Sequence, residues 1–517
     1  MSGIFEKFLV KNKRLLLILS LSLFLVVPGI SQVDLTGDNG HYFIRSVGYI
    51  DHVFSGKQTT PIDWYPQFPG WAFLSFHDHP FLLFFIQHIF ISIHESLFFA
   101  KLPYVLFSLG AIWLMYLWLR EEYDEKFAET AAILLAINPL FVWTARTGFM
   151  EAGVIFFIAL AFYYFSKFCR NDKYWFLFGV SLGLAVLSKY NTFFLIPTFF
   201  FYLLIFNRER LKNKKTYYAI GAALAVFSPS IIYNAMLYKT HGHLDYQFSR
   251  LFHIKSPWNV SNVGDALGSP LSIFMSLGQA TTFVYLGLVF FGLILSLKNR
   301  KLFLPIIGAV FLTLLFVLTG SGNQYMNLYG VMLAPLIAYF FIIVRQKFSK
   351  VYKILFYSLS VYLIFVVINS NLLINPILGP EGAVISSAQS KNYGFYQLDK
   401  YMEKMMKDYR INNQAEGYGH IKSKYPAWLL KYGVSPQITN NNLENVSNLI
   451  VYDQDINWFA RLWPLIRRQF YYNTPMLSVS ELLNQAENLK DKNVNTLFYI
   501  QATENTLLDS VKEYSAT

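Results

Sequence analysis

The chain has 517 residues, of which 54% are apolar, 18% aromatic and only 14% charged. Globular domains carry about 25% charged residues, so the composition excludes a soluble globular protein. The single cysteine, Cys169, excludes an internal disulfide scaffold. A net charge of +12 would indicate a nucleic-acid partner in a soluble protein, but in a membrane protein Lys and Arg also mark the cytoplasmic loops.

The apolar residues are gathered into eleven segments, and a straight span needs about 20 residues. The first follows Lys11, Lys13 and Arg14, as a signal peptide would, but ten further segments favour a retained span. The segments are 15–30, 97–119, 128–144, 152–168, 174–187, 192–206, 216–237, 271–297, 302–319, 326–344 and 351–372. We therefore predict an all-α polytopic membrane protein with about eleven transmembrane helices.

Residues 81–93 are apolar but too short for a span, and the basic loops decide how they are placed. If 81–93 lies flat at the interface, the basic loops near residues 208–215, 298–301 and 345–353 share one side with the N-terminus. This agrees with the rule that Lys and Arg face the cytoplasm. We predict an integral protein of a plasma or inner membrane, with a cytoplasmic N-terminus and an extracytoplasmic C-terminus.

After residue 372 the chain becomes polar and contains β-like runs at 448–452 and 496–500 and a helical stretch at 396–409. From Glu381 onward there are 14 basic and 14 acidic residues, so the charge excess lies entirely before it. That location identifies the net charge as an orientation signal and argues against a nucleic-acid partner. We predict a transmembrane domain at 1–372, with a first outer loop at 31–96 that contains interfacial helices, and an extracytoplasmic α/β domain at 373–517.

With this topology, unusual polar residues collect on the outer face. The first outer loop and the next two outer turns contain the acids, bases and histidines Asp38, His41, Tyr42, Arg45, His77, Asp78, His79, Arg146, Glu151 and Lys189. A charge at the edge of an apolar span costs a few kcal/mol when it is unpaired. Glu151 and Lys189 either extend to the lipid headgroups or belong to one site, and we favour one site.

Four short motifs resemble a known family. The segments Gly37-Asp38-Asn39-Gly40-His41-Tyr42, His77-Asp78-His79-Pro80-Phe81, Arg146-Thr147-Gly148-Phe149-Met150-Glu151 and Leu187-Ser188-Lys189-Tyr190 occur in this order. They resemble, in order and spacing over residues 1–345, the C-type glycosyltransferases that use polyprenyl-phosphate sugars. This superfamily includes the protein O-mannosyltransferases and the lipid A aminoarabinose transferases. Asn39 replaces an acid that is usual in that family, and Glu151 replaces an aspartate.

The resemblance implies a role for each residue. Asp38 and Glu151 are the expected catalytic residues, with Asp38 as the general base for the acceptor. Arg146, Lys189 and His79 are expected to bind the donor phosphate, for which Arg is a bidentate donor and Lys a point charge. The expected substrate-binding residues are Tyr42, Arg45, His77 and Asp78.

A divalent metal is an alternative interpretation of the histidine cluster. His41, His77, Asp78 and His79 are residue types that bind Zn²⁺ or Mn²⁺. An extended His-Asp-His tripeptide does not easily supply three ligands to one ion. We assign no metal ligands and expect no obligatory cofactor.

We therefore predict a membrane glycosyltransferase that moves a sugar from a polyprenyl-phosphate donor to a lipid, glycan or protein acceptor. The first alternative is a transporter or flippase of a lipid-linked or amphipathic substrate. Transporters usually place charges near the bilayer midplane and often have two similar halves, and neither feature is evident here. The second alternative is a membrane-anchored binding protein whose C-terminal region is the working part.

Overall fold

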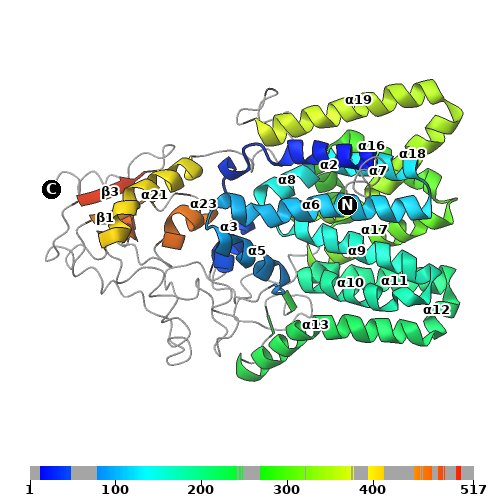
Figure 1. The fold of residues 1–517 in the computed structure, drawn as a ribbon, viewed down its shortest axis with the longest axis horizontal. Helices are drawn as coiled ribbons and strands as arrows, with labels where there is room; N and C mark the ends of the chain where they lie inside the picture. Colours follow the sequence, from blue (N-terminus) through cyan, green and yellow to red (C-terminus); the bar gives the residue numbers. More distant parts are fainter. Residues whose placement is uncertain are drawn as a thin grey trace, which may run out of the picture. The chain divides into compact units, whose positions relative to one another are not determined.

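A computed structural model gives the fold of the chain (Figure 1). It describes residues 12–35, 37–47, 79–241, 244–245, 247–248, 268–320, 322–373, 377, 394–412, 448–453, 456, 458–468, 476–480, 482–483 and 496–501. The chain divides into two compact units. The first comprises Met1–Val33 and His77–Lys391, and the second comprises Asp34–Phe76 and Asn392–Thr517. A domain beginning at residue 373 stays a prediction.

The first unit is a bundle of helices (Figure 1). Its α-helices are α2 (Lys13–Val26), α5 (Leu82–Ile93), α6 (Leu97–Glu122), α7 (Glu125–Ala136), α8 (Pro139–Thr147), α9 (Glu151–Arg170), α10 (Trp175–Ser188), α11 (Leu195–Phe206), α12 (Arg208–Lys212), α13 (Lys214–His241), α15 (Pro270–Thr281), α16 (Phe283–Ser296), α17 (Phe303–Thr319), α18 (Gly330–Lys347) and α19 (Ser349–Val367). Short 3-10 or π turns join them: η1 (Ile30–Gln32), η4 (Asp172–Tyr174), η5 (Tyr190–Phe194), η7 (Arg300–Leu302), η8 (Asn323–Tyr329) and η9 (Ile368–Leu372).

Each of the eleven predicted segments coincides with a helix or a bent helix pair. In the described part of the chain, seven helices are long and apolar enough to cross a membrane, and nine spans result if each bent pair counts as one. The remaining two predicted segments lie on the shorter helices α10 and α11. The segment 271–297 is not one straight helix, because Thr282 has φ 110° and the chain bends by 120° between α15 and α16.

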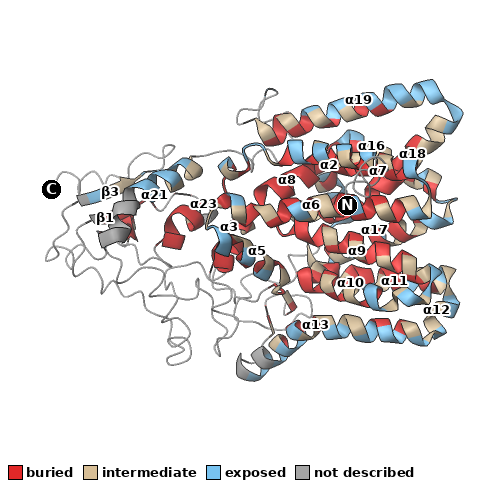
Figure 2. Ribbon diagram, in the orientation of Figure 1, coloured by how far each residue is buried: buried red, intermediate tan, exposed pale blue. Residues whose placement is uncertain are grey.

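The core of the first unit runs along its central helices. Figure 2 shows α8 and α9 mostly buried, whereas α13 and α19 expose long faces. Two glycines bring α10 against α13: a Cβ added at Gly179 would lie 2.3 Å from the Ala219 carbonyl oxygen, and one at Gly183 would lie 2.7 Å from that of Ala223. Small residues allow such close backbone approach between membrane helices, and α10 ends directly before Lys189.

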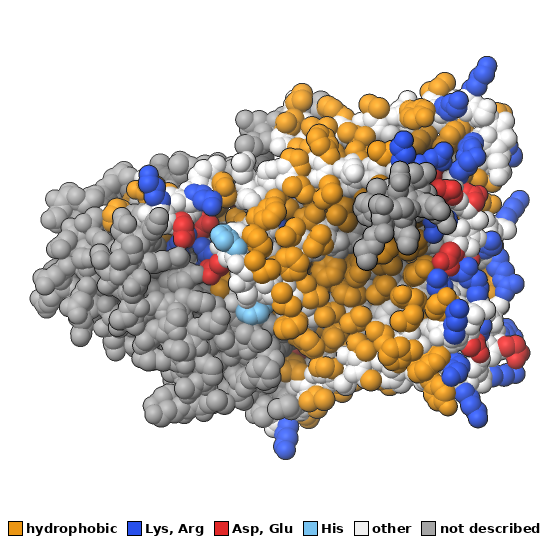
Figure 3. Space-filling model, in the orientation of Figure 1, with side chains coloured by type: hydrophobic (Ala, Val, Ile, Leu, Met, Phe, Trp, Pro, Cys, Tyr) orange, Lys and Arg blue, Asp and Glu red, His pale blue; other side chains and the backbone are white. Residues whose placement is uncertain are grey.

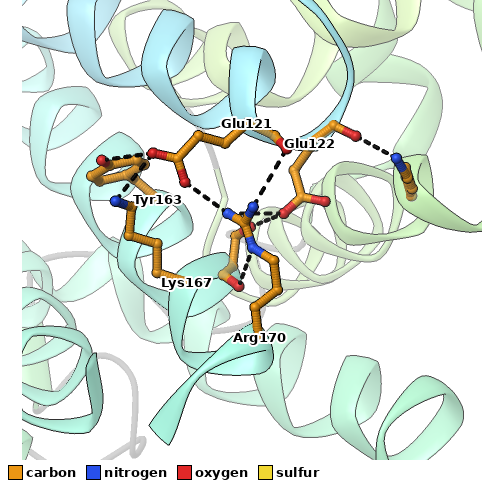
Figure 4. A network of polar contacts seen from close by, with 7 residues as sticks. Glu121, Glu122, Tyr163, Lys167 and Arg170 are labelled. Atoms are coloured by element: carbon orange, nitrogen blue, oxygen red, sulfur yellow. Dashed lines mark hydrogen bonds and ion pairs between the residues drawn. The ribbon is translucent and has the colours of Figure 1, made fainter. Parts of the chain in front are cut away.

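On the face that Figure 3 shows, the bundle has an apolar band, and Lys and Arg side chains gather at one end of it. At that end a polar network joins the last turns of α6 and α9 (Figure 4). Glu121 forms ion pairs with Lys167 at 3.1 Å and with Arg170 at 2.9 Å, and Arg170 also pairs with Glu122 at 3.4 Å. These cations lie in the last turn of α9, where they also complement the helix dipole.

The second unit is mixed α and β. Its helices are α3 (Asp38–Val47), α21 (Phe395–Asn412) and α23 (Trp458–Arg461), and α23 continues into the π turn η11 (Leu462–Ile466). The strands β1 (Asn448–Tyr452), β2 (Met476–Ser478) and β3 (Thr496–Ile500) form a parallel sheet in the order β2-β1-β3. The predicted strands at 448–452 and 496–500 and the predicted helix at 396–409 are confirmed.

Candidate functional site

The turn between α8 and α9 places Arg146 and Glu151 close in the chain. Asn138 caps the start of α8 through backbone N–H groups at 3.0 and 3.2 Å, and Pro139 occupies the first helical position, which suits its fixed φ. Gly148 ends α8 with φ 76°, a conformation that glycine adopts without strain. Arg146 therefore lies in the last turn of α8, and Glu151 begins α9.

Glu151 and Lys189 form a buried ion pair. Lys189 Nζ donates to Glu151 Oε1 at 2.6 Å, and the exposed fractions of the two side chains are 3% and 0%. The ammonium also lies 4.6 Å from the centroid of the Tyr325 ring, in cation–π geometry. The structure thus brings these two predicted site residues together, away from the headgroup position that the alternative interpretation required.

Two further cations hold the segment after α2. Arg146 Nη1 donates to the carbonyl oxygens of Val26 at 2.6 Å and Pro28 at 2.7 Å. Lys101 Nζ donates to those of Ile30 at 3.0 Å and Val33 at 2.6 Å. The last carbonyls of a helix lack partners within the helix, and positive charge is favourable there. Arg146 therefore has a structural contact in addition to its predicted phosphate role, which stays a prediction.

The buried charges around this turn do not balance. Among the described residues of the first unit, the buried charged side chains are three cations, Lys101, Arg146 and Lys189, and two carboxylates, Glu151 and Asp245. Among the described residues, Glu151 Oε2 and Arg146 Nε are buried without a hydrogen-bond partner, and so is the hydroxyl of Tyr104 on α6. Unpaired buried polar atoms are costly, and a ligand or an ordered water at this turn would satisfy them.

The residue after Lys189 belongs to a second buried polar group. Tyr190 OH donates to Asp245 Oδ2 at 2.8 Å, and Asn234 Nδ2 donates to the same oxygen at 2.8 Å. Asp245 Oδ1 accepts from the Phe248 backbone N–H at 2.9 Å. This group fixes the residues after α13 beside Tyr190, so it supports the backbone position of Lys189.

The histidine segment is described only in part. His79 is buried directly before α5, and its ring meets that of Phe84 edge-on at 6.5 Å. His77 and Asp78, which we predicted to bind substrate, lie outside the described residues. No group of three His, Cys, Asp or Glu side chains within the described ranges could hold a metal ion.

Asp38 begins α3 in the second unit. The side-chain oxygen of Asn39 accepts from the backbone N–H groups of Gly37 at 3.1 Å and Gly40 at 3.0 Å. Asn39 therefore stabilises the first turn of the helix, where the resembling family has an acid. Tyr42 and Arg45 are buried in the same helix, and Asp38 is partly exposed. Their predicted catalytic and substrate roles stay predictions.

Three residues of this site were not predicted from the sequence. Lys101 had a visible signal, because an ionisable residue inside an apolar segment is by default a candidate functional group. Nothing in the sequence indicated the contact of Tyr325 with Lys189. Tyr104 gives no sequence signal, since a tyrosine in an apolar helix is ordinary packing.

Comparisons with known proteins identify the fold. Residues 78–233 match the family model described as dolichyl-phosphate-mannose-protein mannosyltransferase. The fold is similar over 98% of the chain to ArnT from Cupriavidus metallidurans bound to undecaprenyl phosphate, with a TM-score of 0.57, 12% identity and 95% of that chain covered. The chain has the C-type glycosyltransferase fold. The predicted resemblance and the all-α membrane fold class are confirmed.

Two further relatives of this fold extend the comparison. The oligosaccharyltransferase AglB of Archaeoglobus fulgidus, solved in complex with an inhibitory peptide and a dolichol-phosphate, has a TM-score of 0.51 and 16% identity over 92% of this chain and 65% of its own. YkcB of Bacillus subtilis (strain 168), which carries a provisional mannosyltransferase name, is 29% identical over 133 residues. These residues are 25% of this chain, and the chain spans only 18% of the length of YkcB.

Proposed function

We propose that the chain is an integral membrane glycosyltransferase that takes a sugar from a polyprenyl-phosphate carrier. The acceptor is a lipid, glycan or protein on the extracytoplasmic face. The observation that carries this proposal is the buried Glu151–Lys189 pair, which lies with Arg146 inside the stretch matching the mannosyltransferase family model. The fold shared with a protein solved with undecaprenyl phosphate supports the same donor class.

The charge of the site favours an anionic ligand. In the described first unit the buried cations Lys101, Arg146 and Lys189 outnumber the buried carboxylates Glu151 and Asp245, and a lipid phosphate would offset this excess. In the proposed site Lys189, Arg146 and His79 bind the donor phosphate as it becomes the leaving group. Glu151 orients Lys189 through the 2.6 Å contact, and neutralising the leaving phosphate lowers the barrier to its departure.

The acceptor side of the proposed reaction belongs to the first outer loop. Asp38 is the general base that removes the proton of the acceptor, and Tyr42, Arg45, His77 and Asp78 bind substrate. No step in this scheme requires a metal.

The proposal is tested by transfer from polyprenyl-phosphate-linked hexoses and pentoses, measured as release of polyprenyl phosphate in native membranes. We expect Asp38→Asn and Lys189→Ala each to lower release by at least about 100-fold. A positioned acid–base group contributes about 10²–10⁴-fold, and a donor that stabilises developing charge contributes about 10²–10³-fold. Glu209→Gln, at an exposed carboxylate of α12, is the matched control. Movement of the donor into sealed vesicles without product would favour the transporter alternative.

Wild-type release by Asp38→Asn would contradict the role of Asp38, and wild-type release by both variants would contradict the proposed site. Mass spectrometry of surface glycolipids and glycoproteins, with and without the protein, identifies the acceptor.

A further inference from the structure

Helix α3, which begins with Asp38, depends on its surroundings for stability. It has only ten residues, and isolated helices shorter than about 12–15 residues are marginal in water. Its sequence includes Gly40 and the β-branched residues Ile44 and Val47, which lower its intrinsic helix propensity. Every residue from Asn39 to Val47 is buried. Packing against other elements must therefore hold this helix in place.

Elements from the C-terminal part of the chain supply this packing. Within the second unit, α3 contacts α23 and η11. The ring of Phe43 meets that of Trp463 edge-on, with centroids 6.1 Å apart and an interplanar angle of 81°. Both side chains are almost fully buried, and such aromatic pairs add to the stabilisation that burial alone provides. Residues more than 400 positions apart thus share one small core.

A second connection lies just before α3. Asp34, four residues from Asp38, accepts from the backbone N–H groups of Phe395 at 3.3 Å and Tyr396 at 3.0 Å. These are the first two residues of α21. A carboxylate at this position satisfies unpaired N–H groups and complements the positive end of the helix dipole. Asp34 therefore serves as an N-terminal cap for a helix in the C-terminal region.

A pair of buried arginines links α21 to the end of η11 and so joins the two connections. Arg468 donates to the Asp399 carboxylate at 2.6 Å and to the Glu403 carboxylate at 3.0 Å, and Arg467 donates to Asp399 at 3.2 Å. Asp399 and Glu403 lie on α21, and the arginines directly follow η11. A continuous path of contacts thus runs from Asp34 through α21 and η11 to Phe43, with α3 as its last member.

We infer that the C-terminal region holds the helix of Asp38 in its working conformation, with Asp34 and Trp463 as positioning residues. This inference rests on the proposed function only for the role of Asp38. It assigns the C-terminal region to the acceptor side of the reaction rather than to an independent task. Loss of either positioning residue frees α3 while the remaining core stays folded.

The test is hydrogen exchange of the full-length protein in lipid nanodiscs. We expect Asp34→Ala and Trp463→Ala to speed exchange of the α3 amides about tenfold, which corresponds to the loss of one charge-assisted hydrogen bond or buried aromatic contact. Asp34→Asn and Trp463→Phe, which keep an acceptor or a ring, should restore most of the protection. The control is Tyr401→Ala, on the exposed face of α21.

Peptides covering β1 and α9 serve as internal references, since they must stay protected if the variants are folded. Unchanged α3 exchange in both alanine variants, or equal loss of protection in β1, would overturn the inference. Release of polyprenyl phosphate from polyprenyl-phosphate mannose is measured on the same samples. The inference expects kcat per folded protein to fall while KM for this donor stays constant. A loss of release that the loss of folded protein accounts for in full, or a rise in KM at unchanged kcat, would contradict it.

Hydrogen exchange and polyprenyl phosphate release together distinguish failure of the proposed function from failure of the positioning inference. If the wild-type protein releases no polyprenyl phosphate but α3 loses protection in the variants, the proposed function fails and the positioning contact stands. If the wild-type protein is active and α3 is unaffected, only the positioning inference fails.

Discussion

At the scale of single residues, the free energy of unfolding should depend strongly on the ion pair of Glu151 and Lys189. Both side chains are almost completely buried, and removing one member of such a pair leaves an uncompensated charge that costs about 3–5 kcal/mol. In the proposed site a donor phosphate would share Lys189 with Glu151. The contact would then serve both the stability of the fold and the binding of the donor.

A double-mutant cycle tests this coupling. We expect Glu151→Gln and Lys189→Met each to lower the midpoint of thermal unfolding strongly, because each leaves the other charge buried alone. The double variant should be more stable than the sum of the two single effects predicts. The measurement is thermal unfolding of the purified protein in one detergent. Additive effects would mean that the two charges do not stabilise each other.

Lys101 gives a second prediction at this scale. Lys101→Met removes two charge-assisted hydrogen bonds to the carbonyls of Ile30 and Val33, each worth about 1.5–3 kcal/mol. We expect a clear fall in the unfolding midpoint and faster exchange of the amides between α2 and α3. Lys350→Met, at an exposed lysine of α19, should change neither quantity. Equal effects of both substitutions would show that Lys101 makes no specific contact.

At the scale of elements, the close packing of α10 on α13 carries Lys189 into position. The glycines at 179 and 183 lie one turn apart and face backbone carbonyls of α13. A methyl group has no room there, whereas Gly221 on α13 has no heavy atom within 4 Å of its Cβ position. Gly183 is thus closely packed and Gly221 is not, so the two glycines of this helix pair can be compared by the same substitution.

Gly183→Ala should separate α10 from α13 and cost about 1–3 kcal/mol, the range typical of overpacking. It should also lower the rate of polyprenyl phosphate release, because α10 ends directly before Lys189. Gly221→Ala should be neutral or slightly stabilising, since alanine has the higher helix propensity. Unfolding midpoints and release rates of both variants provide the check. Similar results for both glycines would contradict a packing role for Gly183.

The network at the opposite end of α6 and α9 should behave differently from the buried pair. Glu121 is 30% exposed and Arg170 is 44% exposed, and partly exposed ion pairs contribute at most about 1 kcal/mol. We therefore expect Glu121→Gln to lower the unfolding midpoint only slightly, with a difference that shrinks as salt rises. A loss as large as that of Glu151→Gln at any salt concentration would contradict this.

At the scale of the whole molecule, local patterns determined what the sequence could predict. Continuous apolar runs identify spans, so all eleven segments coincide with helices, and β-branched runs identified β1 and β3. The sequence could not predict the bend at Thr282, because its φ of 110° is set by tertiary packing. It suggested that Glu151 and Lys189 share a site, but not the carbonyl contacts of Arg146, which join residues about 120 positions apart.

The orientation of the chain in the membrane depends on whether α15 and α16 together form one span. If α15 and α16 form one span, eleven crossings place the two termini on opposite sides of the membrane. If their 120° bend makes them a re-entrant loop, every later loop changes side. The gathering of Lys and Arg at one end of the bundle (Figure 3) favours the span, since basic loops before and after α15–α16 then share the cytoplasmic side.

Cysteine labelling decides between the two, because Cys169 is the single native cysteine and Cys169→Ser gives a clean background. Lys212→Cys precedes α15–α16 and Lys350→Cys follows it, and both positions are exposed. In intact cells we expect a membrane-impermeant maleimide to label neither of them but to label Tyr401→Cys in the C-terminal region. Labelling of Lys350→Cys but not Lys212→Cys would instead identify α15–α16 as re-entrant. The C-terminal region would then lie on the cytoplasmic side. An extracytoplasmic acceptor could not reach it there.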